Sequence, residues 1–250
     1  MRTLAAAISL LTRIPVPIKE SPSPREISRS AVFFPAVGLI IGAVMAALYG
    51  LVAPVFGPSV AATIAIAAEF FLTGGLHLDG LMDTADGMMS GRRRERALEI
   101  MHDARIGPMG AACGVLMLML RAKLMARAGE AGRLGGLVLA PAAARLGMVL
   151  AFAVFPPATP GRGMGSMMAC KVGWPAFAAA LTYAAAVGIW IAGARSLAAI
   201  ACSIFAAMIF GQRFSARLGG VTGDAYGALC EIGEAAALAA FAFRAAGGAV

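Results

Sequence analysis

The sequence carries little charge for its length and few aromatic side chains. Of its 250 residues, 14% are charged, 7% are aromatic and 60% are hydrophobic, and the mean hydropathy is +0.82. Water-soluble domains typically have about 25% charged residues, so an ordinary soluble fold is excluded. The net charge is +8, but the basic residues form short clusters between apolar runs, with few aromatics beside them. This pattern is typical of loops that flank membrane helices and not of a nucleic-acid-binding surface.

Cysteine is also scarce, and its placement excludes two kinds of site. No two cysteines have the short spacing of a zinc site or a disulfide framework, and all lie in or beside apolar segments: Cys113, Cys170, Cys202 and Cys230. We interpret them as small packing residues. Residues 4–11 are apolar, but no small-residue cleavage site follows them, so we expect this segment to be retained and not removed as a signal peptide.

Long apolar runs are what the sequence has in abundance, and about 20 apolar residues suffice to cross a bilayer. We expect about seven transmembrane helices, at residues 31–56, 60–76, 111–120, 134–155, 177–194, 197–210 and 225–243. No strand-like alternation and no internal repeat are visible. The predicted fold is an all-α, polytopic integral membrane helical bundle. We expect residues 1–250 to form a single domain, with an interfacial N-terminal segment at 1–30 and a polar cytoplasmic segment at 77–110.

A few ionisable residues fall inside or at the ends of these apolar runs. An acid at the depth of Glu69 is costly and seldom faces lipid, so it either pairs with a basic residue or belongs to a site. The third predicted span is short and is followed by Arg121, Lys123 and Arg127. Either Arg121 and Lys123 point back into the bundle, or this segment is re-entrant.

The distribution of basic residues predicts the topology. The basic N-terminal segment is expected on the cytoplasmic side of the membrane, and two crossings return residues 79–105 to that side. Further crossings bring residues 164–171 and 213–224 there as well, so all the polar, glycine-rich loops but one meet on a single face. Three basic residues at the outer end run against the positive-inside tendency: Lys123, Arg127 and Arg133.

Residues 74–110 form a polar island in an apolar chain and hold six of the 13 acidic residues. Asp79, Asp83 and Asp86 are spaced i, i+4 and i+7, which places their carboxylates on one stripe of a helix. Three like charges on one face repel and favour a cation, and such oxygen ligands suit Mg²⁺ or Mn²⁺ together with a diphosphate substrate. The alternative is a solvated face neutralised by the arginines of residues 92–96.

Other polar residues of the island have two interpretations each. The guanidinium of Arg105 suits a phosphate or carboxylate clamp. His77 is a candidate metal ligand or general base, although a lone histidine at a helix end is more often structural, and His102 is a weaker candidate. Glu95 and Glu99, which follow an arginine run, are expected on a salt-bridged surface helix.

A second polar segment, residues 219–227, opens the last predicted helix with the sequence GGVTGDAYG. Glycine-rich turns before a helix expose backbone N–H groups to an anion, and Asp224 adds a candidate metal ligand or base. Locally, a helix start capped by Thr222 or Asp224 explains the pattern equally well. Function is favoured because Glu231 and Glu234 continue an acidic face from Asp224 into the membrane.

Several segments in order resemble the cobalamin synthase family, adenosylcobinamide-GDP ribazoletransferase. They are SLLTRIPVP, FFPAVGLIIG, GGLHLDGLMDTADG, EIMHDARIGPMG and GGVTGDAYGALCEIGE, and together they cover essentially the full chain. The resemblance implies a Mg²⁺-dependent membrane transferase that joins adenosylcobinamide-GDP to α-ribazole or its 5′-phosphate. The implied products are GMP and adenosylcobalamin or its 5′-phosphate, in a late step of cobalamin biosynthesis.

The resemblance also assigns residues. The acidic motif falls on Asp79, Asp83 and Asp86 and implies the metal ligands, while the remaining motifs fall on Asp103, Arg105, Thr222, Gly223 and Asp224. Leu78, Ala104 and Met109 stand where some relatives have glutamate, serine and phenylalanine, so contacts by those groups are not expected here. In the implied mechanism Mg²⁺ bridges the diphosphate, and Arg105 and Lys123 stabilise the growing charge. Either Asp224 or His77 accepts the proton.

Two other functions fit part of the pattern. A phosphatidyl-transfer enzyme acting on a CDP-activated lipid also sets aspartates around Mg²⁺ at a membrane face, and only the family segments argue against it. A transporter would use Glu69, Arg145, Glu231 and Glu234 as coupling sites within the bilayer. The lack of an internal repeat and the clustering of acids at one face make the transporter the weaker alternative.

Overall fold

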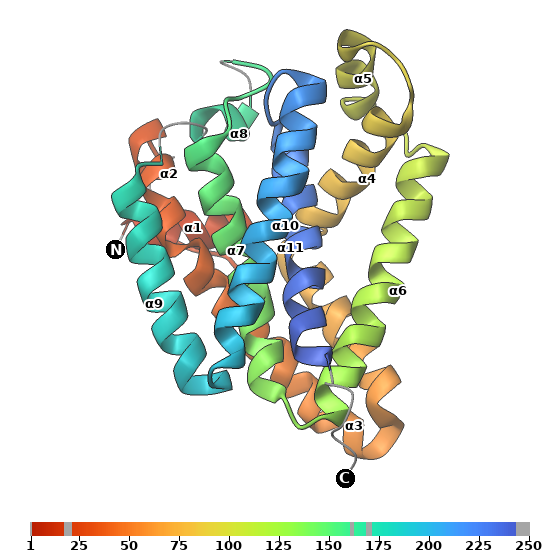
Figure 1. Ribbon diagram of the computed structural model, residues 1–250, viewed down its shortest axis with the longest axis vertical. Coiled ribbons are helices and arrows are strands. Elements are labelled where there is room, and N and C mark those ends of the chain that lie inside the picture. Colours follow the sequence, from red (N-terminus) through yellow and green to blue (C-terminus); the bar gives the residue numbers. More distant parts are fainter. Residues whose placement is uncertain (1, 18–21, 161–162, 169–171, 244–250) are drawn as a thin grey trace.

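The computed structural model describes residues 2–17, 22–160, 163–168 and 172–243, and these are almost entirely helical (Figure 1). Within them the only extended pairing is an isolated bridge between Pro157 and Val221. The expectation for Cys170 lies outside the described residues. The helices are α1 Arg2–Leu11, α2 Pro24–Ser30, the 3-10 turn η1 Ala31–Phe33, α3 Phe34–Thr73, α4 Leu76–Met89, α5 Arg94–Met101, α6 Pro108–Glu130, α7 Leu134–Val154, α8 Gly163–Met168, α9 Trp174–Ala192, α10 Arg195–Leu218 and α11 Gly223–Ala242.

Six helical segments of the described chain are long and apolar enough to cross a membrane. The first of them, Pro24–Thr73, contains a sharp bend at Gly57, whose φ of 82° is a backbone conformation that favours glycine. Figure 1 shows the two arms of α3 meeting at the lower end of the molecule. The arms correspond to the predicted spans 31–56 and 60–76. The prediction of an all-α polytopic membrane bundle with about seven spanning helices is therefore confirmed.

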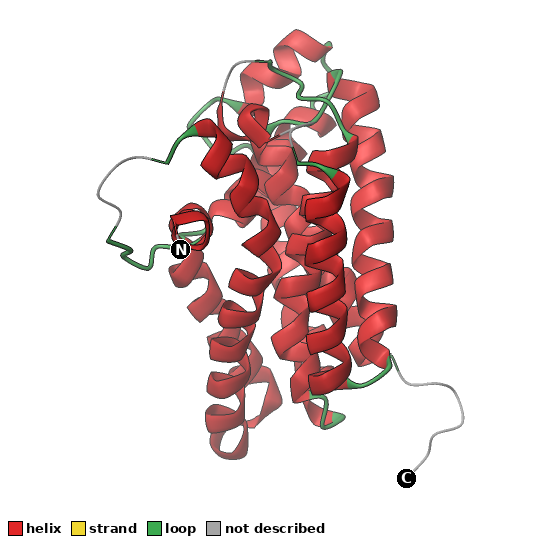
Figure 2. Ribbon diagram, turned by 90° about the vertical axis from the view of Figure 1, so that its left-hand side faces the viewer, coloured by secondary structure: helices red, strands yellow, loops and turns green. Residues whose placement is uncertain are grey.

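Helices α7 and α11 form the centre of the bundle, and the other long helices surround them. Most of the side chains of α7 and α11 are buried, whereas only a minority of those of α9 and α6 are. Helix α3 packs on α7, and α10 packs on both central helices. Figure 2 shows α1 nearly end-on beside the long helices, so it lies across their direction. The outer helices therefore present apolar surface to lipid while the polar residues gather around the centre.

Two boundaries differ from the prediction. Helix α10 continues to Leu218, well past the predicted end at residue 210, so the predicted polar loop at residues 213–224 is confined to the turn before Gly223. Helix α6 is a continuous helix from Pro108 to Glu130, so the re-entrant alternative is wrong. Both helices continue through polar residues, so a hydropathy pattern alone places the helix ends too early.

A buried ion network explains why α6 carries a basic residue at mid-span. The guanidinium of Arg121 contacts carboxylates from two other helices: Glu69 on α3 and Glu231 and Glu234 on α11. Arg145 on α7 lies 3.7 Å from Glu69 and 3.8 Å from Glu234. All five side chains are buried. The expected inward orientation is thus confirmed for Arg121, but it is wrong for Lys123, which is exposed two residues farther along α6.

The basic residues at the opposite end of the bundle have structural partners as well. Arg127 donates to the carbonyl of Ala242, and Arg133 donates to the carbonyls of Phe241 and Phe243. These carbonyls belong to the C-terminal end of α11, where intrahelical donors are lacking and positive charge is favourable. Helix capping therefore accounts for two of the basic residues that conflict with the positive-inside tendency.

The ion network generates a prediction about stability. Arg121→Met removes the cation that compensates three buried carboxylates, so we expect a loss of about 3–5 kcal/mol in the free energy of unfolding. The matched control is Lys123→Met on the exposed face of the same helix, for which we expect a change within about 0.5 kcal/mol. Thermal unfolding of both variants in detergent micelles measures the difference. Equal losses would contradict the assignment of Arg121 as the compensating charge.

Candidate active site

Helix α4 carries the acidic stripe and is too short to be one of the spanning helices. It follows α3 directly after Gly74 and Gly75 and lies at the same end of the molecule as α5 and α8 (Figure 1). Asp79 is exposed, whereas Asp83 and Asp86 are half-buried. The stripe therefore lies at one end of the bundle, beside the segments that the topology prediction brings together.

Helix α4 packs closely against the first turn of α11, and glycine makes this contact possible. A Cβ atom at Gly80 would lie 2.6 Å from the carbonyl oxygen of Asp224. Across the same contact, a Cβ atom at Gly227 would lie 3.2 Å from the carbonyl oxygen of His77. The backbones thus approach to a distance that side chains would prevent. The acidic stripe and the segment 219–227 are adjacent, as the topology prediction requires.

The start of α11 is fixed by one of the two candidate caps. The hydroxyl oxygen of Thr222 accepts a hydrogen bond of 3.1 Å from the backbone N–H of Ala225. The Asp224 side chain is half-buried within the first turn. Thr222 is therefore the N-cap residue.

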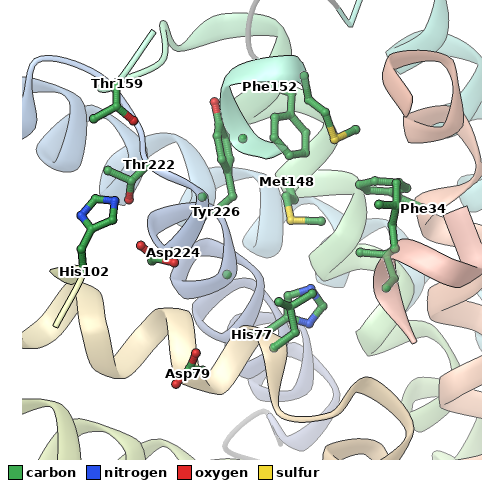
Figure 3. Close-up of a pocket in the computed structure, with 17 residues that line it drawn as sticks. Phe34, His77, Asp79, His102, Met148, Phe152, Thr159, Thr222, Asp224 and Tyr226 are labelled. Atoms are coloured by element: carbon green, nitrogen blue, oxygen red, sulfur yellow. The ribbon is translucent and has the colours of Figure 1, made fainter. Parts of the chain in front are cut away.

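A cavity of about 520 Å³ opens where α4 and α11 meet (Figure 3). Five of the predicted site residues line it: His77, Asp79, Thr222, Gly223 and Asp224. The other five are not part of its lining: Asp83, Asp86, Asp103, Arg105 and Lys123. The cavity also has lining residues that the sequence analysis did not select, among them Phe34, His102, Met148, Phe152, Thr159 and Tyr226. The structure thus joins the two predicted acidic segments around one cavity and adds an apolar wall.

The carboxylates of this region are close enough to affect one another. Burial raises the pKa of Asp83 to about 7, with further contributions from the negative charges of Asp79, Asp224 and Asp86. Such a cluster is relieved by a cation. Among the described residues, however, no group of three His, Cys, Asp or Glu side chains is arranged to hold a metal ion. The metal-ligand role of Asp79, Asp83 and Asp86 stays a prediction.

Asp86 has a second role that the spacing did not indicate. Its carboxylate accepts hydrogen bonds from the backbone N–H groups of Gly107, at 2.7 Å, and Gly110, at 2.8 Å. These donors belong to the start of α6, so Asp86 satisfies N–H groups that have no partner within that helix. Asp86 therefore connects α4 to α6 in this structure.

The two histidines differ in their surroundings. His77 is buried, and its Nε2 atom has no hydrogen-bond partner. Burial, helped by the positive charge of Arg145, lowers the pKa of His77 to about 3, so the ring is neutral. The Nδ1 atom of His102 lies 2.5 Å from the carbonyl oxygen of Leu98, and the residue faces the cavity together with Asp224 (Figure 3). His102 was the weaker candidate by sequence, yet both histidines line the cavity.

Arg105 is paired in this structure, and its side chain is 89% exposed. Its guanidinium lies 2.8 Å from the carboxylate of Asp103, and the resulting hydrogen bonds lower the pKa of Asp103 to about 2. A substrate clamp built on Arg105 would have to exchange this carboxylate for a phosphate. The substrate-binding roles of Asp103, Arg105 and the exposed Lys123 stay predictions.

The arginine run 92–96 is partly structural. Arg94 donates to the carbonyl oxygens of Leu218, at 2.6 Å, and Ala158, at 2.8 Å. These contacts fasten the start of α5 to the end of α10 and to the loop after α7. Farther along α5, Arg96 and Glu99 form an exposed ion pair with a distance of 2.7 Å. The salt-bridged surface helix expected for this segment is confirmed.

The profile of one protein family, described as cobalamin-5-phosphate synthase, matches residues 3–242. The chain belongs to this family. An adenosylcobinamide-GDP ribazoletransferase of Roseiflexus sp. is 41% identical over 94% of this chain and 87% of the relative. The proteins of the same name from Pseudomonas paraeruginosa and Thermoanaerobacter pseudethanolicus are 38% and 34% identical, over 97% and 96% of this chain and 98% and 97% of the relatives. No solved structure matches the chain.

The close approach at Gly80 leads to a prediction. Gly80→Ala places a methyl group against the backbone of Asp224, so we expect overpacking to cost about 1–3 kcal/mol in the free energy of unfolding. The control is Gly50→Ala on α3, where a Cβ atom would meet no atom within 4 Å. That substitution should be neutral or stabilise the helix by up to about 1 kcal/mol. Thermal unfolding in micelles compares the two, and a neutral Gly80→Ala would contradict the close contact.

The aspartates of the stripe should respond oppositely to loss of charge. In the presence of a chelator, Asp83→Asn removes one repelling carboxylate and should raise the Tm. Asp86→Asn should lower it, because the amide offers one acceptor oxygen to two backbone donors. Each effect should be about 1 kcal/mol after solvent screening. Shifts in the same direction for both variants would show that the roles of Asp83 and Asp86 do not differ in this way.

Proposed function

We propose that this protein is an adenosylcobinamide-GDP ribazoletransferase. In this reaction a ribose hydroxyl of α-ribazole, or of its 5′-phosphate, attacks the phosphorus nearest the cobinamide. The new P–O bond replaces the bond to GMP, which leaves with its phosphate. The observation that carries the proposal is the cavity at which two acidic segments meet, with Asp79 from α4 facing Asp224 from α11. The names of the family relatives supply the substrates.

The carboxylates around the cavity suit a magnesium ion. Mg²⁺ prefers oxygen ligands and is usually held by one or two carboxylates together with substrate phosphates and water. Asp79 and Asp224 line the cavity, and Asp83 lies close enough for all three charges to repel. When bound, the ion would neutralise the diphosphate and its leaving oxygen. Because the substrate itself supplies ligands, a cage of three protein side chains is not required.

The proton of the attacking hydroxyl goes to Asp224 in this proposal. Of the two candidates, His77 is the weaker base, because burial lowers its pKa to about 3. The Asp224 carboxylate lies in the first turn of α11, where it lines the cavity beside Thr222. The N–H groups that open α11 also suit the anionic diphosphate. Asp224 and the start of α11 would thus orient the acceptor and the leaving group together.

We place the cavity at the cytoplasmic face of a bacterial inner membrane. Exposed arginines of α5 and of the end of α10 gather at the same end as the cavity. At the opposite end, Arg127 and Arg133 are engaged with the carbonyls of α11. The positive-inside tendency therefore favours this orientation.

The proposal predicts a metal-dependent reaction. Purified protein in detergent or nanodiscs should form GMP from adenosylcobinamide-GDP and α-ribazole when Mg²⁺ is present, and a chelator should stop it. Asp79→Asn should lower kcat by about a hundredfold or more, since it removes charge that acts on the diphosphate. The matched control is Glu95→Gln, whose side chain is 73% exposed on α5. It should leave GMP formation unchanged.

Parallel incubations separate the proposal from the lipid alternative. A CDP-activated lipid and an alcohol acceptor should give no CMP under the same conditions. Release of CMP but not GMP would replace the proposed function with phosphatidyl transfer. Full turnover by the Asp79→Asn protein, with a Tm that matches the wild type, would contradict the metal-binding role of Asp79.

A further inference from the structure

The cavity has two chemically different ends. Its polar end is formed by Asp79, His102, Thr159, Thr222 and Asp224. Its other end is mainly apolar: Figure 3 shows Phe34, Met148 and Phe152 grouped there, with the neutral ring of His77 on the same side and Tyr226 between the two ends. The polar end suits the reacting groups of the substrates. The mechanism above uses no side chain of the apolar end.

The aromatic rings at the apolar end are held in place by contacts with one another. The rings of Phe152 and Tyr226 have centroids 4.0 Å apart and an angle of 34° between their planes. Phe34 meets Phe152 edge-to-face, with centroids 6.3 Å apart. All three side chains are at most 3% exposed. Rings fixed in this way form a preorganised surface, and the neighbouring thioether of Met148 also favours contact with an aromatic ring.

The chemistry of this end discriminates among the parts of the two substrates. A cavity of about 520 Å³ has the size of a small-molecule site and is too small for a complete corrinoid. Guanine has exocyclic amino and carbonyl groups that need hydrogen-bond partners, and leaving them unpaired against apolar walls is costly. The benzimidazole of ribazole is flat, aromatic and without exocyclic polar groups. It is the part of the substrates that fits best.

We propose that the apolar end binds the aromatic base of the ribazole acceptor and that Phe152 determines which bases fit. This inference rests on the proposed function and names a specificity-determining residue within it. A base held by Phe34, Met148 and Phe152 directs its ribose toward the polar end. A ribose hydroxyl is then presented to Asp224, the proposed proton acceptor. The guanosine and the corrinoid remain outside this end of the cavity.

The test uses Phe152→Ala in the full-length protein. We expect the KM for α-ribazole to rise at least tenfold, while the KM for adenosylcobinamide-GDP changes less than twofold and kcat at saturating ribazole changes less than threefold. The enlarged cavity should also accept a ribonucleoside with a bulkier, tricyclic aromatic base. The ratio of kcat/KM for that nucleoside over ribazole should rise at least tenfold relative to the wild type. If Phe152 had a purely structural role, Phe152→Ala would lower kcat/KM for ribazole and for the bulkier nucleoside by the same factor.

A control and a second measurement complete the design. Phe205→Ala removes a ring that is 68% exposed on α10, and it should change neither the KM values nor the base preference. Equilibrium binding of α-ribazole alone should weaken in Phe152→Ala and not in Phe205→Ala. An increase in the KM for the GDP substrate with an unchanged KM for ribazole would overturn the inference, as would equal losses for all acceptors. Failure of the wild type to form GMP would instead reject the proposed function.

Discussion

The contact of Arg121 with three buried glutamates is the interaction on which the rest of the structure depends. It joins α6 to α3 and α11, and Arg145 extends it to α7, so four helices are tied together by charge at the centre of the bundle. Within an apolar bundle each of these charges is costly unless compensated, which leaves few alternative arrangements. Glu231 lies two helical turns beyond Asp224 on α11. The network therefore fixes the height and rotation of the helix that presents Asp224 to the cavity.

Close packing of α4 on α11 then brings the residues of the site together. Helix α4 does not cross the bundle, and it reaches α11 only because Gly80 allows backbone contact at Asp224. This contact brings the acids of α4 next to an acid of α11, where their mutual repulsion favours a cation. At the other end of the stripe, Asp86 holds the start of α6, the helix that carries Arg121. The cavity lining and the ion network thus share α3, α7 and α11, and Asp86 links the stripe to α6.

Much of the fold followed from the sequence, because apolar length and isolated charges are strong constraints in a membrane protein. The spanning segments, the break between the spans 31–56 and 60–76 and the pairing of Glu69 with a basic residue were all predictable. Lys123 was misplaced because two residues along a helix turn the side chain by about 200°, onto the opposite face from Arg121. The acidic half of the cavity was predictable from motifs. Its apolar half was not predictable. Phe34, Met148 and Phe152 lie on apolar helices, and the hydrophobic pattern of such a helix is the same whether a side chain contacts lipid, a neighbouring helix or a cavity.

The position of the cavity suggests why such a reaction is carried out by a membrane protein. Its apolar wall includes Phe34 of α3 and Met148 and Phe152 of α7, which are spanning helices. Its acidic side combines Asp79 of α4, which is too short to span, with Asp224 at the start of α11. Under the proposed function, the site must hold a flat apolar base and a highly charged diphosphate within a few ångströms of each other. A small soluble domain would have to bury the carboxylates to build the apolar wall, and burial disfavours their charge. Where a helical bundle emerges from the bilayer, an apolar interior and an aqueous surface adjoin. One set of helices can therefore bind the apolar base and the charged diphosphate side by side.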